Sequence, residues 1–458
     1  MAPDVARPTA GTGTGRPGGP SRRTTLRALA LPALASLAPA VSAGCGRSGR
    51  GTVRVAVQWS GWELTAFQQV VAQFTSDTNW DVAVLPVGSD INALLGARSA
   101  REATPDVAML SQPGQVRQFR RRLTPIDPAW AANFPTAWRD LVTIDGEEMG
   151  VWFKTAHKSM VWYLPGVLDR QRVEPPRTYL DWLGADQRLG DAGLAPLAVG
   201  AADGWVLSDW FCNVLLGLDP QTYGQLARGG TDAVGHWRSE PVREALTLVG
   251  QAWARPGTFP GGVRRALLTQ FDESVVEVYT RRQAAMVAEG DFVYPVISRY
   301  GRPDVSVAWF PFPPQRPGGD RPVLVGGDVA VLLDNAGPGG RDLVRYLGSA
   351  EAANVWARQG GFVSVLDRGV PRSEYPPVYT DTTMTDRPLI DDVRTGMDGS
   401  IEFSLSDQIV GPLAGGDGQG LWAILQNFLR QVAGADGEGI DSAAARTVRD
   451  IVDRLRSR

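Results

Sequence analysis

Acidic or amide side chains stand close to tryptophan or phenylalanine at four places in this chain. The places are Trp59 and Trp62 with Glu63, Trp205 with Asp209, Asp291 with Phe292, and Trp422 after the Gly-, Asp- and Gln-containing residues 416–420. An aromatic face suits the C–H face of a sugar ring, and a neighbouring carboxylate accepts from the hydroxyls at the ring edge. A single tryptophan more often packs in a core. Four such clusters indicate a site for a sugar-type ligand.

The same acids leave an enzymatic alternative open. A glycoside hydrolase needs two carboxylates on either side of the bond that it cleaves. The chain offers Glu63, Asp209, Glu289, Asp291 and Asp328 for such a pair. The sequence contains no Gly-x-Ser-x-Gly elbow, Walker loop or dinucleotide fingerprint. We therefore expect a protein without catalytic residues and keep a secreted glycoside hydrolase as the alternative.

Metal centres and cofactors are not expected either. The chain has two cysteines, Cys45 and Cys212, and two histidines, His157 and His236. These are too few for a disulfide framework or for a zinc site built from histidine and cysteine. We predict no metal and no cofactor, with Cys212 as a small buried hydrophobic residue.

Two lysines stand out because the other basic residues are all arginine. Lys154 and Lys158 lie in the short run FKTAHKS, and 44 arginines make up the rest of the 46 basic residues. A coding bias toward arginine makes a retained lysine unusual. The run is therefore a candidate site. The alternative is that two rare residues lie close together by chance.

The N-terminal segment has the layout of an export signal. Arg22-Arg23 precede a mostly apolar run at residues 28–41, and Cys45 follows small residues. The apolar run is too short, and too interrupted by proline, to span a bilayer of about 30 Å. We predict an export signal over residues 1–44, lipidation of Cys45 and a tether over residues 45–52. The protein then lies on the outer face of the cytoplasmic membrane, held by its lipid.

Charge excludes some partners. The formal net charge is −3, and removal of residues 1–44, which carry five arginines and one aspartate, leaves about −7. A mildly acidic chain has no electrostatic reason to bind nucleic acid. We expect no nucleic-acid partner.

The first part of the mature chain alternates strands with helices. Strands are expected at residues 53–58, 81–86 and 105–110, each followed by a helix, at residues 63–75, 90–100 and 115–122. This order predicts an α/β fold with a mainly parallel sheet. Ligands bind such sheets beyond the carboxyl ends of the strands. Residues 59–63 and 111–114, which include Gln112, occupy that position.

The later elements are predicted from periodicity and composition. We expect β structure at residues 151–163, 195–199, 305–312 and 323–333, helices over much of 221–300, at 341–359 and at 421–432, and mostly loop at 366–400. Gly326-Gly327-Asp328 interrupts the apolar run of residues 323–333, which indicates a bend or a close backbone approach.

A series of longer motifs runs through the chain in a fixed order. The motifs are VQWSGWELTAFQQVVAQF, TPDVAMLSQPGQVRQF, GVWFKTAHKSMVWY, DGWVLSDWFCNVLL, QAAMVAEGDFV, VLVGGDVAVLL and AANVWARQGGFVS. In the order and spacing of these motifs, rather than in any one of them, the chain resembles the extracellular solute-binding lipoproteins of carbohydrate ABC transporters, and the alpha-glucoside-binding type among them. The resemblance covers nearly all of residues 51–435.

The resemblance implies a two-lobed, periplasmic-binding-protein-like α/β fold with the ligand in the cleft between hinged lobes. The first lobe would comprise residues 51–152 and 326–368, and the second residues 153–325 and 369–458. The implied ligand-binding residues are Trp59, Trp62, Glu63, Gln112, Lys154, Trp205, Asp209, Asp291, Phe292, Gly327, Asp328 and Trp422. The implied protein is a monomer that delivers a mono- or oligosaccharide to ABC permease subunits. A receptor of the same fold for a non-sugar solute is the remaining alternative.

Overall fold

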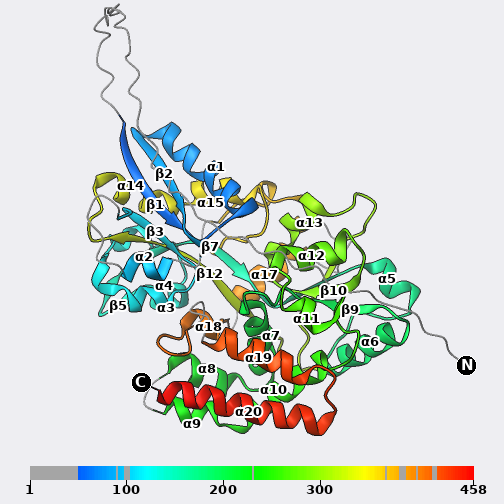
Figure 1. The fold of residues 1–458 in the computed structure, drawn as a ribbon. Helices are drawn as coiled ribbons and strands as arrows, with labels where there is room; N and C mark the ends of the chain where they lie inside the picture. The colour runs from blue at the N-terminus through cyan, green and yellow to red at the C-terminus, as the bar shows by residue number, and fades with distance from the viewer. Residues whose placement is uncertain are drawn as a thin grey trace, which may run out of the picture. The chain divides into compact units, whose positions relative to one another are not determined.

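A computed structural model gives the fold of one unit, which runs from Arg50 to Arg458 (Figure 1). It describes residues 50–88, 91–96, 104–229, 232–366, 369–380, 388–398, 401–414 and 420–457. The predicted export signal, Cys45 and residues 45–49 of the predicted tether lie outside the described residues. Among the described helices, none has the length and apolar character needed to cross a membrane.

The larger sheet found in the described residues is built around one long strand, β12. β1 pairs in parallel with β2 and β3, as the alternation of strands and helices predicts. β12 runs antiparallel to β3, β4 and β7 but parallel to β13, so beyond the first three strands the expectation of a mainly parallel sheet is wrong. The strands are β1 (Gly51–Val57), β2 (Trp80–Pro86), β3 (Val107–Leu110), β4 (Leu123–Thr124), β7 (Gly150–His157), β12 (Leu324–Leu333) and β13 (Glu402–Phe403).

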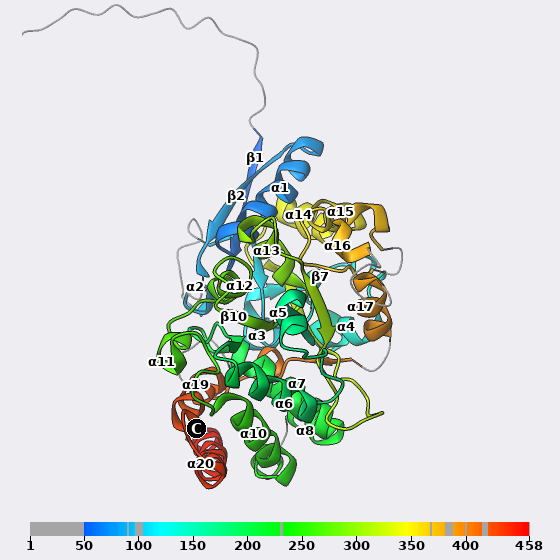
Figure 2. The ribbon, with the colours of Figure 1, turned by 90° about the vertical axis from the view of Figure 1, so that its right-hand side faces the viewer.

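Helices pack beside this sheet, and Figure 2 shows α1, α14 and α15 grouped near β1. α1 buries the residues that its periodicity predicts, including Phe67, Val70 and Phe74. The helix expected at 341–359 is two helices, because Gly348 ends the first and the Ser349 hydroxyl caps the second by accepting from the Ala352 N–H at 3.3 Å. The elements are α1 (Gly61–Asp77), α2 (Ile91–Gly96), α3 (Gly114–Gln118), α4 (Thr136–Val142), α14 (Pro338–Leu347), α15 (Ala350–Ala357), and the small hairpin of β5 (Thr143–Ile144) and β6 (Glu147–Glu148).

A second sheet has the strand order β11-β8-β10-β9. β9 and β10 are parallel, whereas β8 is antiparallel to both β10 and β11. β10 interrupts the region predicted as largely helical, because its short sequence AAMVA is rich in alanine and too brief to show a strand period. The strands are β8 (Met160–Tyr163), β9 (Ala195–Ala198), β10 (Ala284–Ala288) and β11 (Ala308–Pro311).

Most of the remaining helices surround this second sheet or pack on one another, as α10, α19 and α20 do (Figure 1). α20 was not expected from the sequence, and residues 366–400, expected to be mostly loop, contain α16 and α17. The helices are α5 (Pro165–Arg170), α6 (Tyr179–Asp191), α7 (Trp205–Leu218), α8 (Pro220–Arg228), α9 (Ala233–Trp237), α10 (Glu240–Trp253), α11 (Gly262–Ala266), α12 (Phe271–Tyr279), α13 (Tyr294–Tyr300), α16 (Pro377–Thr380), α17 (Leu389–Asp398), α18 (Leu405–Gln408), α19 (Leu421–Val432) and α20 (Gly437–Arg456).

The buried apolar residues form two cores. The first covers the larger sheet and extends to Trp162, Val287 and Trp309 of the second sheet, and the second lies between the second sheet and helices that include α6, α7 and α10. In the first, Trp138 makes edge contacts with Trp152 and Phe403, with ring centroids 4.9 Å and 4.7 Å apart. In the second, Trp182 stacks on Trp210 at 5.0 Å. Large aromatic side chains dominate both cores. Seven of the twelve largest fully buried side chains in the described residues are tryptophans.

The chain enters or leaves the larger sheet at three places that lie together, and we call these the crossing segments. β7 ends at His157 and β8 begins at Met160, so Lys158 and Ser159 form the first connection. Residues 312–323 lead from β11 to β12, and Ser404 leads from β13 to α18. Backbone hydrogen bonds join these connections, because the Lys158 N–H donates to the Leu324 carbonyl at 2.7 Å and the Ser404 N–H donates to the Val325 carbonyl at 3.1 Å. These crossing segments position the candidate site.

The start of α6 offers a test of local stability. The Thr178 hydroxyl accepts from the Asp181 N–H at 3.1 Å, and the Asp181 carboxylate accepts from the Thr178 N–H at 3.0 Å, which is a capping box. We predict that Thr178→Ala lowers the free energy of unfolding by about 1 kcal/mol. Urea unfolding measures the change. Thr65→Ala, on the exposed face of α1, is the control, and an equal loss in both variants would contradict the prediction.

Candidate ligand-binding site

Lys154 lies at the centre of a buried cluster of charges. Its strand, β7, pairs with β12 so that Lys154 stands directly opposite Asp328, and the register shifts immediately after Asp328. The Lys154 ammonium forms an ion pair with Glu63 of α1 and lies 4.0 Å from the Asp328 carboxylate. The Lys154 side chain is 8% exposed. Two strands and one helix therefore bring these three predicted residues together.

Aromatic rings border the same ammonium. Lys154 Nζ lies 5.8 Å from the ring centroid of Phe292 and 5.5 Å from that of Trp356. Phe292 in turn contacts Trp205 at 5.9 Å and Phe271 at 5.2 Å. The cation is thus held by carboxylates on one side and by ring faces on another, which is the combination of groups that the sequence predicts for a sugar-type ligand.

Burial and charge shift the pKa values in this cluster. Burial lowers the pKa of Lys154, but the carboxylates of Glu63, Asp328 and Asp291 together raise it above the usual value. Burial raises the pKa of Asp328 and of Asp291 to about 7 each, although Lys154 opposes the shift in both. Burial and the nearby Glu63 raise the pKa of Asp272 to about 6. The cluster therefore exchanges protons near neutral pH.

One carboxylate oxygen of Asp291 accepts no hydrogen bond from the described residues. Its Oδ1 accepts from the His157 N–H at 3.3 Å, and its backbone carbonyl accepts from the Tyr379 hydroxyl at 2.7 Å. Its Oδ2 is buried and has no hydrogen-bond partner among the described residues. An unpaired buried carboxylate oxygen is costly unless another donor reaches it, and a ligand hydroxyl is such a donor.

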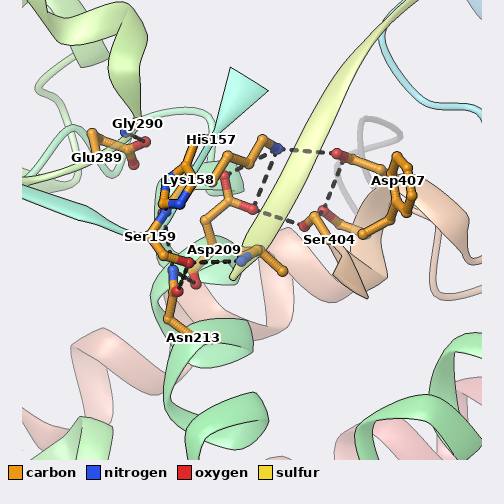
Figure 3. Close-up of polar contacts among 12 residues, drawn as sticks. His157, Lys158, Ser159, Asp209, Asn213, Glu289, Gly290, Ser404 and Asp407 are labelled. Carbon is orange, nitrogen blue, oxygen red and sulfur yellow. Dashed lines mark hydrogen bonds and ion pairs between the residues drawn. The ribbon is translucent and has the colours of Figure 1, made fainter. Parts of the chain in front are cut away.

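Asp209 belongs to a second cluster around the other lysine (Figure 3). Lys158 Nζ lies 3.2 Å from the Asp209 carboxylate and 3.0 Å from the Asp407 carboxylate. The Ser404 hydroxyl also donates to Asp209, at 2.7 Å. No described contact joins Asp209 to Lys154, so the structure assigns these two predicted residues to different clusters.

The other predicted residues are spread around these clusters. Trp59 and Trp62 are buried against Trp356, at centroid distances of 5.3 Å and 6.1 Å, and the Arg299 guanidinium lies over the Trp62 ring at 5.5 Å. The Gln112 side-chain nitrogen and the Trp422 indole N–H are buried and have no partner in the described part of the chain.

The close approach of the β7 and β12 backbones requires glycine at position 327. A Cβ at this position would lie 2.3 Å from the Lys154 carbonyl oxygen, so only glycine allows β12 to approach β7 here. The Gly326-Gly327 interruption in the apolar run correctly indicates this approach.

Four residues of the two clusters were not predicted. Trp356 lies in the motif AANVWARQGG, where helical spacing indicates only a core position, and Asp272 lies in the first turn of α12. Arg299 and Asp407 stand among ordinary surface and loop residues in the sequence. Among the described residues, no group of histidine, cysteine and acidic side chains could hold a metal ion.

Known proteins share this architecture. Residues 61–354 match the model of the bacterial extracellular solute-binding protein family. The osmoprotective compounds-binding protein GgtB of Synechocystis sp. is 30% identical over 66% of this chain and 74% of its own length. The alpha-glucosides-binding periplasmic protein AglE of Rhizobium meliloti is 24% identical over 68% of this chain and 72% of its own. The solved structure of the bacterial solute receptor AcbH has a TM-score of 0.71 at 18% identity, covering 89% of this chain and 99% of that one.

The fold is that of the two-lobed periplasmic solute-binding proteins, which is a class of transport proteins rather than of enzymes. The chain belongs to the bacterial extracellular solute-binding protein family. It is an exported protein and the substrate-binding component of an ABC transporter. The predictions of fold and of protein class are thereby confirmed.

The raised pKa of Asp291 gives a test of the site. Its pKa of about 7 in the folded protein exceeds the usual 3.8, so its neutral form stabilises the fold at low pH and that stabilisation is lost as the pH rises through 7. Relative to Asp291→Asn, the wild type should lose stability between pH 5 and pH 8, by at most about 1.4 kcal/mol per pH unit.

The measurement is the free energy of unfolding of both proteins at each pH. Asp450→Asn, at an exposed position of α20, is the control and should follow the wild type throughout. A difference between wild type and Asp291→Asn that does not change with pH would show that Asp291 keeps an ordinary pKa.

Proposed function

We propose that the protein binds a mono- or oligosaccharide, of the alpha-glucoside type, and delivers it to the permease of its ABC transporter. One observation carries this proposal: a buried ammonium, Lys154, lies between the carboxylates of Glu63 and Asp328 and beside the rings of Phe292 and Trp356. Neighbouring sugar hydroxyls both donate and accept, so they bind an ammonium and a carboxylate at once.

The charges of the cluster favour a neutral solute. Four carboxyl groups, of Glu63, Asp272, Asp291 and Asp328, interact with Lys154 or with one another. Arg299 also acts on Asp272, and both Lys158 and Asp407 act on Asp328, so five acids face three cations. An anionic ligand would add repulsion to this acidic surplus. The name of the relative AglE also supports an alpha-glucoside, whereas that of GgtB refers to osmoprotective compounds.

We propose that the protein closes around the sugar by a hinge motion between two lobes. We assign the first lobe to residues 51–152 and 326–368 and the second to residues 153–325 and 369–458, with the ligand between them and a hinge in the crossing segments. The proposed ligand residues remain those predicted from the sequence, with Asp272, Arg299 and Trp356 added. A monomer suffices for this role, because one chain supplies the whole cluster.

A panel of sugars tests the ligand class. A ligand at 100 times its Kd adds about 2.7 kcal/mol to the free energy of unfolding. We expect a higher Tm with at least one alpha-glucoside, such as maltose, trehalose or sucrose. If a non-sugar osmolyte raises the Tm and every sugar fails to do so, the protein is a receptor of the same fold for a non-sugar solute. If the protein releases monosaccharide from the disaccharides, it is a glycoside hydrolase.

Two tryptophan variants test the site. Trp205 is half-buried and touches Phe292, whereas Trp138 is packed in the core against Trp152 and Phe403. We predict that Trp205→Ala weakens sugar binding about tenfold or more with little loss of stability, because it removes ring contact with the ligand. The matched Trp138→Ala should lower stability by about 3–5 kcal/mol. Titration calorimetry and urea unfolding measure the two effects, and unchanged affinity in Trp205→Ala would exclude that residue from the site.

Membrane attachment has a separate test. Cys45 follows small residues at the end of the predicted export signal, and its acylation would tie the mature chain to the membrane. We predict that Cys45→Ala moves the protein from the membrane fraction to the soluble fraction and removes lipid mass from its N-terminal peptide. Cys212→Ala is the control, because Cys212 is buried. An unmodified Cys45 in purified wild type would disprove the anchor.

A further inference from the structure

Lys158 and its neighbour Ser159 connect the three crossing segments to the helix α7. Lys158 lies in the first connection, between β7 and β8, and its side chain is 11% exposed. Its ammonium is 3.2 Å from Asp209, in the second turn of α7, and 3.0 Å from Asp407 of α18 (Figure 3). α18 follows the connection that leaves β13. One buried cation thus joins two crossing segments to α7.

Hydrogen bonds complete the tie. The Asn213 side-chain Nδ2 of α7 donates to the Lys158 backbone carbonyl at 3.0 Å, and the Ser159 hydroxyl donates to the Asn213 side-chain Oδ1. The Leu324 N–H, at the start of β12, donates to the Ser159 hydroxyl at 2.7 Å. The third crossing segment is therefore attached to the same helix through Ser159.

Each attached element carries a candidate ligand residue within a few positions. Lys154 lies on β7, four residues before Lys158, and Asp328 lies on β12, four residues after Leu324. Trp205 begins α7, one turn before Asp209. None of these three candidates touches Lys158 in a described contact. A cation at the point where their elements meet sets the relative positions of all three.

We propose that Lys158 is a positioning residue for ligand binding. Its ion pairs with Asp209 and Asp407 hold the first connection and the segment after β13 against α7, next to the start of β12, which Ser159 attaches to the same helix. This role rests on the proposed function for its ligand, but the arrangement itself belongs to the ligand-free protein. Removing one partner of a buried ion pair leaves charges without compensation, so the segments should separate where Lys158 is absent.

The charges around Lys158 give the proposal a pH signature. Asp209, Asp407 and Glu289 face it, Asp328 lies further along β12, and His157 precedes it with a pKa that burial lowers to about 4. Burial raises the pKa of Asp407 to about 6, although Lys158 opposes the shift. Without Lys158 the carboxylates repel one another once they ionise. The defect should therefore grow from pH 5.5 to pH 8.5.

The test compares Lys158→Met with wild type and with the double variant Lys158→Met/Asp407→Asn. Relative to wild type at the same pH, we expect Lys158→Met to weaken sugar binding at least about tenfold at pH 8 and less at pH 5.5. The double variant should recover part of the affinity and show a smaller pH dependence, because Asp209 and Glu289 remain. Arg243→Met, which removes an exposed cation from a surface pair with Glu240, is the control and should bind as wild type does.

Hydrogen exchange of the ligand-free proteins separates this proposal from the proposed function. Faster exchange at Leu324 and Ser404 in Lys158→Met, with α10 unchanged, supports the positioning role even if no sugar binds the wild type. Uniformly faster exchange, or affinity equal to wild type at every pH, would overturn it. If Lys158→Met does not fold, Asp407→Asn decides: faster exchange at Ser404 with weaker binding supports the role, and wild-type behaviour in both overturns it.

Discussion

The antiparallel pairing of β7 with β12 is the constraint on which the rest of the site depends. The pairing places Lys154 opposite Asp328 and His157 opposite Val325. Successive residues of a strand point to opposite faces of a sheet, so a shift of one residue would separate the ammonium from its carboxylate. The glycine at position 327 allows the close approach that this register needs. Both lysine clusters follow from this one strand pair.

Charged groups as deeply buried as these are seldom retained for stability alone. A well-packed apolar replacement of a buried ion pair is often neutral or stabilising. This chain nevertheless surrounds each of its two lysines with two carboxylates, close to the place where the chain passes between sheets. Fixed charges exclude alternative packings more strictly than apolar side chains do, and a receptor needs that precision where a ligand's hydroxyls must be matched.

The sequence predicts the fold well where local periodicity is strong. The strand before Trp59 and the helix that contains Glu63 appear where expected, as does the glycine-interrupted strand that carries Asp328. Prediction fails for β10, whose alanines suit a helix equally well, and for the two helices in residues 366–400, where proline and aspartate suggest loop. The division of the site into two clusters was also beyond sequence reasoning. Asp209 pairs with Asp407 through Lys158, and no local pattern records which distant carboxylates share a cation.

The scarcity of lysine has a practical consequence. Lys154 and Lys158 are the only lysines in the chain, and both are largely buried and ion-paired. A protease specific for lysine can therefore cut this protein only within β7 or directly after it. Cleavage of the native chain would report the opening of that segment rather than the exposure of its surface. The protein thus carries a built-in proteolytic reporter at the place where its two sheets join.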